Sequence, residues 1–195
     1  MPAPPSMEAQ RPDSPTVSPL IYPLDEFYAQ AARPLPAIES IPADRIAEPY
    51  RSLLVHDQDM TPTLERFHQR SIHLELLSRQ HRDDFYFREV VLILDGTEQP
   101  VEFGAIKMNL SLLPSAARRE ILEERLPLGH ILAEHKIAHA SRPKAFLRIQ
   151  SDDFISRALR LEGSHALFGR RNTLLDPRHF PIAEIVEILP PAGHE

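Results

Sequence analysis

Proline most constrains what this chain can fold into, because its ring fixes φ and removes a backbone hydrogen-bond donor. The sequence holds 20 prolines but only 6 glycines among 195 residues, and 11 of the prolines lie at or before Pro49. Residues 1–48 are therefore predicted to form a proline-rich leader that is largely disordered at its start. Its apolar residues between Leu20 and Tyr28 leave two interpretations open: an arm that lies on the folded domain, or an unstructured leader.

The pattern changes after the leader, and residues 49–191 are predicted to form one folded domain. Strands are predicted at 71–78, 84–94, 101–110, 144–150, 165–175 and 182–189, and helices at 49–56, 61–69, 115–125, 128–135 and 151–161. Thr61 and Ser151 are the expected N-caps of the second and the last of these helices. The strands mostly connect as hairpins, and the helices are inserted between them in blocks. This order is typical of an α+β fold with an antiparallel sheet, whereas a parallel sheet needs strands and helices that alternate.

Composition excludes several classes of function. The chain has no cysteine, so it offers no disulfide, no thiolate metal site and no cysteine nucleophile. Its net charge of −6 argues against a nucleic-acid partner, and no apolar run is long enough for a membrane span, so a cytoplasmic monomer or small homo-oligomer is expected. Motifs for nucleotide binding and for serine hydrolysis are absent. His135 and His139 are spaced like metal ligands, but two histidines are too few, so no metal is expected.

Arg88 is the first candidate for a ligand-binding residue. Alternation along strand 84–94 places it on the same face as Val90 and Leu92, in a segment that is apolar on both faces. A guanidinium in such surroundings is costly unless an anion meets it. Two interpretations follow: a structural arginine paired with a carboxylate of the fold, or a residue that binds the carboxylate of a ligand through two parallel hydrogen bonds.

Other charged residues near the end of the chain are ambiguous when taken alone. Glu184 and Glu187 lie three residues apart in one predicted strand, so they point to opposite faces and at most one can face a given pocket. The same alternation places Arg170 and Arg171 on opposite faces. The simplest interpretation of these two arginines is a pair of charges on the protein surface. Pro127-Leu128-Gly129 starts a predicted helix, and free N–H groups at a helix start can meet an anion.

Taken together, these motifs resemble the chorismate pyruvate-lyase (4-hydroxybenzoate synthase) family. The matching segments, in chain order, are Leu53-Leu54 with Asp59-Met60-Thr61 and Glu65-Arg66-Phe67; Arg88-Glu89-Val90-Val91-Leu92 running into Asp95-Gly96; Pro127-Leu128-Gly129; Gly169-Arg170-Arg171; and Val186-Glu187-Ile188-Leu189-Pro190. Each segment is short, but their shared order over residues 49–191 is specific. The spacing from Arg171 to the final Glu is longer than in the family, so Glu187 is assigned by its apolar context, with Glu184 in reserve.

The resemblance implies a fold and a reaction. The expected fold is a single domain with an antiparallel sheet of about six strands, and helices and flaps that cover a buried ligand. The expected reaction eliminates pyruvate from chorismate to give 4-hydroxybenzoate, without a metal or an organic cofactor. The product would serve as a quinone precursor of the ubiquinone type or in secondary metabolism.

The resemblance also implies roles for individual residues. Arg88 and the backbone N–H of Leu128 would hold the ring carboxylate, and Glu187 would contact the ring hydroxyl. Met60 would lie in a flap over the substrate. Arg170 or Arg171 would neutralise the second carboxylate of chorismate, and alternation allows only one of them on the pocket face.

The competing hypothesis is a binding module without catalysis. Effector-binding domains of some bacterial transcription regulators share a related fold and hold small ligands without chemistry. Such regulators carry a DNA-binding domain, and residues 1–48 show no helix-turn-helix pattern. A non-catalytic module for small aromatic acids is therefore the alternative to the lyase.

Overall fold

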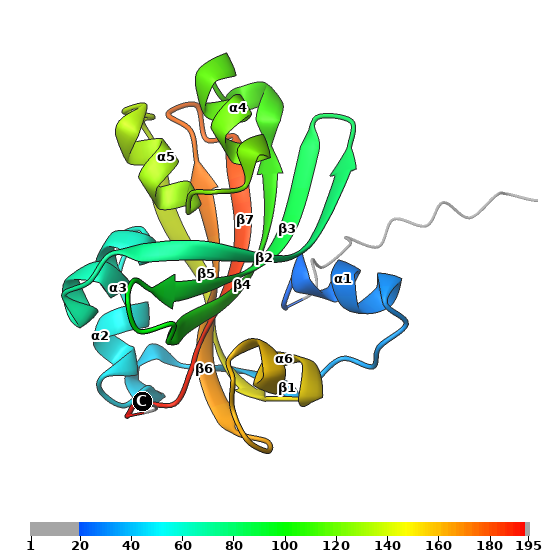
Figure 1. Cartoon of the computed structure of the whole chain (residues 1–195), viewed down its shortest axis with the longest axis vertical. Helices are drawn as coiled ribbons and strands as arrows, with labels where there is room; N and C mark the ends of the chain where they lie inside the picture. The colour runs from blue at the N-terminus through cyan, green and yellow to red at the C-terminus, as the bar shows by residue number, and fades with distance from the viewer. Residues whose placement is uncertain (1–19, 194–195) are drawn as a thin grey trace, which may run out of the picture.

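The computed structural model describes residues 20–193, so the predicted disordered start of the leader lies outside the described residues. Figure 1 shows one twisted antiparallel sheet, whose strand order is β1-β5-β6-β7-β4-β3-β2. The strands are β1 (Ile38–Ile41), β2 (Ile72–Arg82), β3 (Phe85–Leu94), β4 (Pro100–Asn109), β5 (Ala140–Gln150), β6 (Ala166–Leu175) and β7 (Pro181–Leu189). The helices are α1 (Leu24–Gln30), α2 (Tyr50–Leu54), α3 (Met60–His68), α4 (Ser115–Glu123), α5 (Leu128–Glu134) and α6 (Asp153–Ala158), with short 3₁₀ turns η1 (Ala43–Arg45) and η2 (Leu110–Leu112). The predicted α+β class with an antiparallel sheet is confirmed.

The sheet has one strand more than the six or so expected, and the extra strand comes from the leader. β1 pairs antiparallel with β5, with Ile38 opposite Ile149. Upstream of it, α1 buries Leu24, Phe27 and Tyr28 against the sheet, and the Tyr28 hydroxyl donates to Asp152 Oδ2 at 2.8 Å. Of the two interpretations of residues 20–48, the structure shows the arm that lies on the domain.

The two faces of the sheet are covered by different helices. On one face, α1 and α6 pack over Phe87, Val91 and Ile93 of β3. The other face carries Tyr86, Leu92 and Leu94, and it is covered by α2 and α3 at one end and by α4 and α5 at the other. This is the alternation predicted for residues 84–94, and it places Arg88 on the face covered by α2 to α5.

Two helix caps differ from prediction, by two residues at α3 and by one residue at α6, and side-chain contacts explain where they fall. Thr61 was predicted to cap the helix at 61–69, but α3 begins at Met60 and its N-cap is Asp59. The Asp59 carboxylate makes no capping bond because it faces His139. The α6 cap is Asp152 rather than Ser151, and its Oδ1 accepts from the N–H groups of Phe154 and Ile155.

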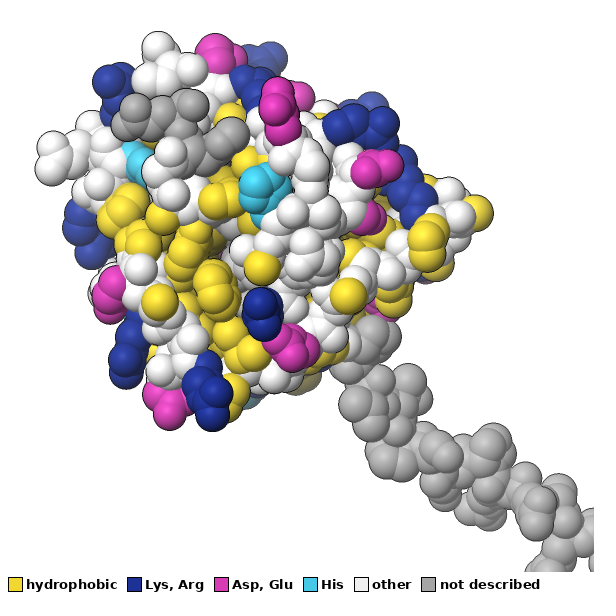
Figure 2. Space-filling view, turned by 90° about the horizontal axis from the view of Figure 1, so that it is seen from below, with side chains coloured by type: hydrophobic (Ala, Val, Ile, Leu, Met, Phe, Trp, Pro, Cys, Tyr) yellow, Lys and Arg dark blue, Asp and Glu magenta, His cyan; other side chains and the backbone are white. Residues whose placement is uncertain are grey.

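The end of the molecule next to the C-terminus has a mixed surface. Figure 2 shows apolar side chains gathered there, with charged side chains around them. A groove at the C-terminal tail is lined by residues that include Tyr50, Phe67 and Pro190. Within residues 20–193, none of the helices has the length and apolar character required to cross a membrane.

Candidate ligand-binding cavity

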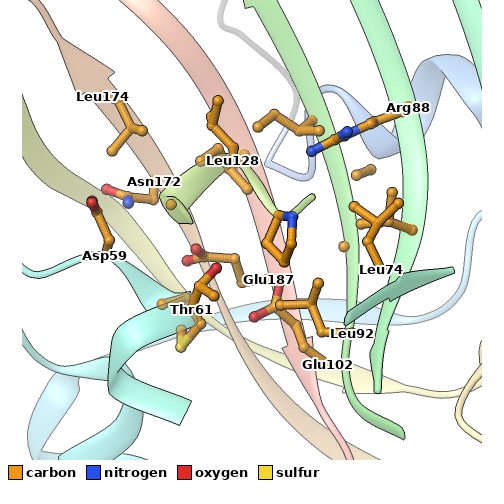
Figure 3. Close-up of a pocket in the computed structure, with 18 of the residues that line it drawn as sticks. Asp59, Thr61, Leu74, Arg88, Leu92, Glu102, Leu128, Asn172, Leu174 and Glu187 are labelled. Carbon is orange, nitrogen blue, oxygen red and sulfur yellow. The ribbon is translucent and has the colours of Figure 1, made fainter. Parts of the chain in front are cut away.

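A cavity lies between the sheet and the helices α3 and α5, and Figure 3 shows its lining. Its floor comes from β2, β3, β4, β6 and β7, and its cover comes from Asp59–Thr61 and Pro127–Gly129, at the starts of α3 and α5. Most of the lining is apolar: Met60, Leu74, Val90, Leu92, Ala105, Ile106, Pro127, Leu128, Leu132, Leu174 and Ile185. The polar lining side chains are few: Asp59, Thr61, Arg88, Glu102, Asn172 and Glu187. A mostly apolar pocket with a few polar groups is the usual form of a small-molecule site.

Arg88 reaches this cavity from β3 and is 1% exposed. Its Nη2 donates to the carbonyl oxygen of Leu126 at 3.3 Å, whereas Nε and Nη1 have no hydrogen-bond partner within residues 20–193. Burial lowers the pKa of Arg88 to about 10, so the guanidinium remains a cation at neutral pH. Among the lining residues that the structure describes, it is the one cation. A buried cation with unpaired donors is stabilised when a carboxylate arrives.

Glu187 lines the opposite part of the cavity and is already paired with a buried arginine. Both its carboxylate oxygens face Arg170, which lies opposite it in the β6–β7 register. The Arg170 side chain is fully buried and also donates to three backbone carbonyls between α2 and α3: Leu54 at 3.3 Å, His56 at 3.1 Å and Gln58 at 3.1 Å. Arg170 therefore ties this connection to the sheet, and its hydrogen bonds leave little for a ligand.

Arg171 and Glu184 occupy the other face of the sheet. Arg171 Nη2 lies 3.6 Å from Glu184 Oε1, and the Lys107 ammonium lies 3.5 Å from Glu184 Oε2. The expected division of both pairs between the two faces is thus observed. Glu187 rather than Glu184 lies in the cavity, and Arg170 rather than Arg171 lies on the cavity side. A second carboxylate of a ligand would not find a free arginine on the cavity side, because Arg170 is already paired with Glu187.

The cover of the cavity contains the other two residues that the resemblance selects. Met60 is the first residue of α3 and is 4% exposed, and Leu128 is the first residue of α5 and is 7% exposed. The two helix starts approach closely at Gly129, where an added Cβ would lie 3.1 Å from the Thr61 side chain. All four residues selected for substrate contact, apart from the arginine pair, therefore meet in one cavity: Met60, Arg88, Leu128 and Glu187.

Two polar residues of the lining were missed from the sequence. Glu102 on β4 is 5% exposed and its Oε2 has no hydrogen-bond partner among the described residues. Asn172 on β6 donates from Nδ2 to the Ser141 hydroxyl at 2.8 Å, while Oδ1 is unpaired within the same range. A signal for Glu102 was present, because it lies between Val101 and Phe103 as Glu187 lies between Val186 and Ile188. Asn172 gave no comparable signal.

His139 holds the cover in place from the loop before β5. Its Nδ1 lies 2.8 Å from the carbonyl oxygen of Ile137, and its Nε2 lies 2.9 Å from Asp59 Oδ2. Both partners are acceptors, so both ring nitrogens must carry hydrogen to make both bonds, which is the cationic form of histidine. The hydrogen bond to Asp59 is the main reason that the pKa of His139 is raised.

The arrangement can bind an anion. The cation at one end would pair with a carboxylate, the aliphatic walls suit a ring or a short apolar body, and the acids at the other end suit an oxygen-bearing group. Arg88 is buried, and an ion pair formed with a buried group is stronger than one formed in water.

Solved structures with the same fold are known. The crystal structure of PhnF from Mycobacterium smegmatis is 12% identical, and the match covers 85% of this chain and 92% of PhnF with a TM-score of 0.51. The effector domain of the same protein is 15% identical over 67% of this chain and 87% of that domain, with a TM-score of 0.50. A ligand-binding domain assigned to a GntR-family transcriptional regulator of Bordetella bronchiseptica is 9% identical over 62% and 86%, with a TM-score of 0.49.

These comparisons define the class of fold. The chain shares its α+β fold with PhnF and with the PhnF effector domain. At such low identity the likeness concerns the fold alone. No protein-family model matches the sequence, and no curated protein matches it.

Proposed function

We propose that this domain binds a small carboxylic acid in the cavity between the sheet and helices α3 and α5, and that the ligand carries a ring. The observation that carries the proposal is Arg88, a buried cation that faces the cavity with Nε and Nη1 unpaired among the described residues. The aliphatic lining supports a ring, because burying apolar surface adds about 25 cal/mol for each Å² removed from water. The fold shared with effector-binding domains is consistent with binding without chemistry.

Calorimetric titration tests this proposal with 4-hydroxybenzoate as the acid and 4-hydroxybenzamide as its neutral analogue. We expect the acid to bind and Arg88→Met to weaken that binding by about 10- to 100-fold, because charge-assisted hydrogen bonds contribute about 1.5–3 kcal/mol. Arg148→Met is the matched control, since Arg148 is an exposed arginine on β5 that pairs with Glu39. Equal binding of acid and amide, or unchanged binding by Arg88→Met, would contradict the proposal.

A second candidate function is the elimination of pyruvate from chorismate. One observation favours it: Met60, Arg88, Leu128 and Glu187, selected by resemblance to the lyases, lie far apart in the sequence yet all line the cavity. In this reaction the ring C–O bond to the enolpyruvyl group breaks, a ring proton is lost, and the departing enol becomes pyruvate, which leaves 4-hydroxybenzoate. Arg88 and the Leu128 amide would hold the ring carboxylate, and Glu187 would orient the hydroxyl.

We place the lyase second because chorismate carries two carboxylates, whereas Arg88 is the one cation of the described lining. Incubation of the purified protein with chorismate, followed by chromatographic separation, distinguishes the two functions. Equal amounts of pyruvate and 4-hydroxybenzoate, lost in Arg88→Met, would establish the lyase. Binding of 4-hydroxybenzoate without turnover of chorismate would establish the binding module.

A further inference from the structure

Glu102 is the one acidic residue of the described lining that makes no ion pair, since Glu187 pairs with Arg170 and Asp59 with His139. Its carboxyl is buried in the cavity wall, and its Oε2 makes no hydrogen bond with residues 20–193. The room for it is provided by Gly104, where an added Cβ would lie 3.1 Å from Glu102 Oε1. A side chain at position 104 would therefore press on this carboxyl.

The charges around Glu102 favour its neutral form. The charged groups that act on Glu102 are Glu187 and Arg170, and the Arg170 guanidinium already faces Glu187 and three carbonyl oxygens. A second carboxylate at this place would be desolvated and would repel Glu187. Burial, and then the Glu187 charge, raise the pKa of Glu102 well above its ordinary value. A protonated carboxyl group has an O–H donor, which a carboxylate lacks.

Arg88 and Glu102 lie at different ends of the cavity. Across the β3–β4 ladder, Arg88 is opposite Ile106 and Glu102 is opposite Leu92. The two rows are four residues apart, or about 13 Å along the strands at the usual rise per residue. Figure 3 shows the two side chains on separate sides of the lining, with aliphatic residues between them.

We propose that Glu102 is a specificity-determining residue, and that its protonated carboxyl donates a hydrogen bond to an uncharged oxygen at the end of the ligand remote from Arg88. The inference rests on the proposed function and narrows its ligand class. The cavity would select ring-containing monocarboxylic acids with a hydroxyl or carbonyl oxygen at the far end. A second carboxylate there would be rejected by Glu187 and by the absence of a balancing cation.

Titration calorimetry at pH 7 with 4-hydroxybenzoate, benzoate and terephthalate tests the proposal. We expect the wild-type protein to bind 4-hydroxybenzoate about tenfold more tightly than the other two, which corresponds to one hydrogen bond of about 1.4 kcal/mol. Glu102→Met should lose this preference and bind benzoate as well as the wild type does. Glu102→Gln should keep the preference for the hydroxyl, because its amide still donates. Glu75→Gln, an exposed acid on β2, is the matched control.

The outcomes separate this inference from the proposed function. If the wild type binds none of the three acids, the proposed function is wrong and the inference with it. If the wild type binds them but Glu102→Met keeps the tenfold preference, only the role of Glu102 is wrong. An infrared difference spectrum of wild type minus Glu102→Gln, without ligand at pH 7, gives an independent reading. It should contain the C=O band of a protonated carboxyl, and a spectrum with carboxylate bands alone would overturn the proposal.

Discussion

Two buried arginines on the same face of the sheet have opposite surroundings. Arg170 on β6 meets Glu187 and donates to three carbonyls of the α2–α3 connection. Arg88 on β3 makes one hydrogen bond, to the carbonyl of Leu126, and faces the cavity with the rest of its guanidinium. Both are at most 1% exposed. Burial alone therefore does not identify a ligand-binding arginine. The hydrogen bonds and ion pairs that its guanidinium makes or lacks do identify it.

The register of the sheet produces this difference. Arg170 is opposite Glu187 across the β6–β7 ladder, so its counter-charge is built into the fold. The cross-strand neighbours of Arg88 are Ile106 on β4 and Arg79 on β2, neither of which is an acceptor. A structural role for Arg170 and a ligand-binding role for Arg88 follow, and the comparison can be tested by mutation.

The largest effect is expected for Arg170→Met. It leaves Glu187 as an uncompensated buried charge and removes the donors to the α2–α3 connection, so the free energy of unfolding should fall by about 3–5 kcal/mol. Urea denaturation followed by circular dichroism measures this loss. Arg171→Met, the adjacent residue on the opposite face, should cost less, and Arg170→Met with Glu187→Leu should recover much of the loss. Equal losses of unfolding free energy for Arg170→Met and Arg171→Met would contradict the structural role assigned to Arg170.

The next largest loss of stability is expected from a substitution at Gly169, the residue before Arg170. An added Cβ at Gly169 would fall inside van der Waals contact of the Glu187 carbonyl oxygen, on the neighbouring strand. Gly169→Ala should therefore force β6 and β7 apart and lower the free energy of unfolding by about 3 kcal/mol. Gly129→Ala is the matched change near the cavity cover, where the added Cβ would lie 3.1 Å from Cβ and Oγ1 of Thr61 and 3.5 Å from Cδ of Pro62, and no backbone atom is as close as at Gly169. It should change stability by less than about 1 kcal/mol, because alanine is also the better helix former.

Arg88→Met should have the opposite sign from Arg170→Met. Arg88 makes no ion pair among the described residues, and the nearby Glu124 carboxylate offsets the desolvation of its charge only in part. Replacing this buried cation by an apolar side chain of similar length should therefore raise the free energy of unfolding of the ligand-free protein by about 1–2 kcal/mol. Urea denaturation under the same conditions provides the comparison. A loss of several kcal/mol would instead show that Arg88 is a structural residue, as its first interpretation from the sequence allowed.

The smallest effect concerns the contact that holds the cavity cover. The pKa of His139 is raised by its hydrogen bond to Asp59, so its stabilisation is fully present below the ordinary histidine pKa, about 6.5, and is lost as pH rises through the raised value. His139→Gln should remove this pH dependence, with an effect on the order of 1 kcal/mol. Unfolding titrations of both proteins from pH 6 to 8 check it. Parallel curves would mean that His139 stays in one protonation state over this range.

Much of the fold was predictable because its signals are local. Hairpins joined by turn residues such as Asp95-Gly96 indicate an antiparallel sheet, and alternation along residues 84–94 puts Arg88 beside Val90 and Leu92. β1 was missed because residues 38–41 form a short edge strand among prolines, and its pairing with β5 is a contact between distant segments. The hydrogen bond between Asp59 and His139 is also a contact between distant segments, so the shifted start of α3 could not be predicted either.

The site was predictable in part, for a related reason. Placement of Arg88 and of one glutamate of β7 on the cavity face follows from a period of two along each strand, which the sequence carries. The state of each charge depends on its cross-strand and overlying neighbours, which only the assembled sheet brings together. The long-range register of the strands pairs Arg170 with Glu187 and leaves Arg88 without an ion pair. It also places Glu102 beside Glu187 with no cation of its own. Electrostatic interactions act through space, so the folded arrangement rather than the order of residues decides which charges remain for a ligand.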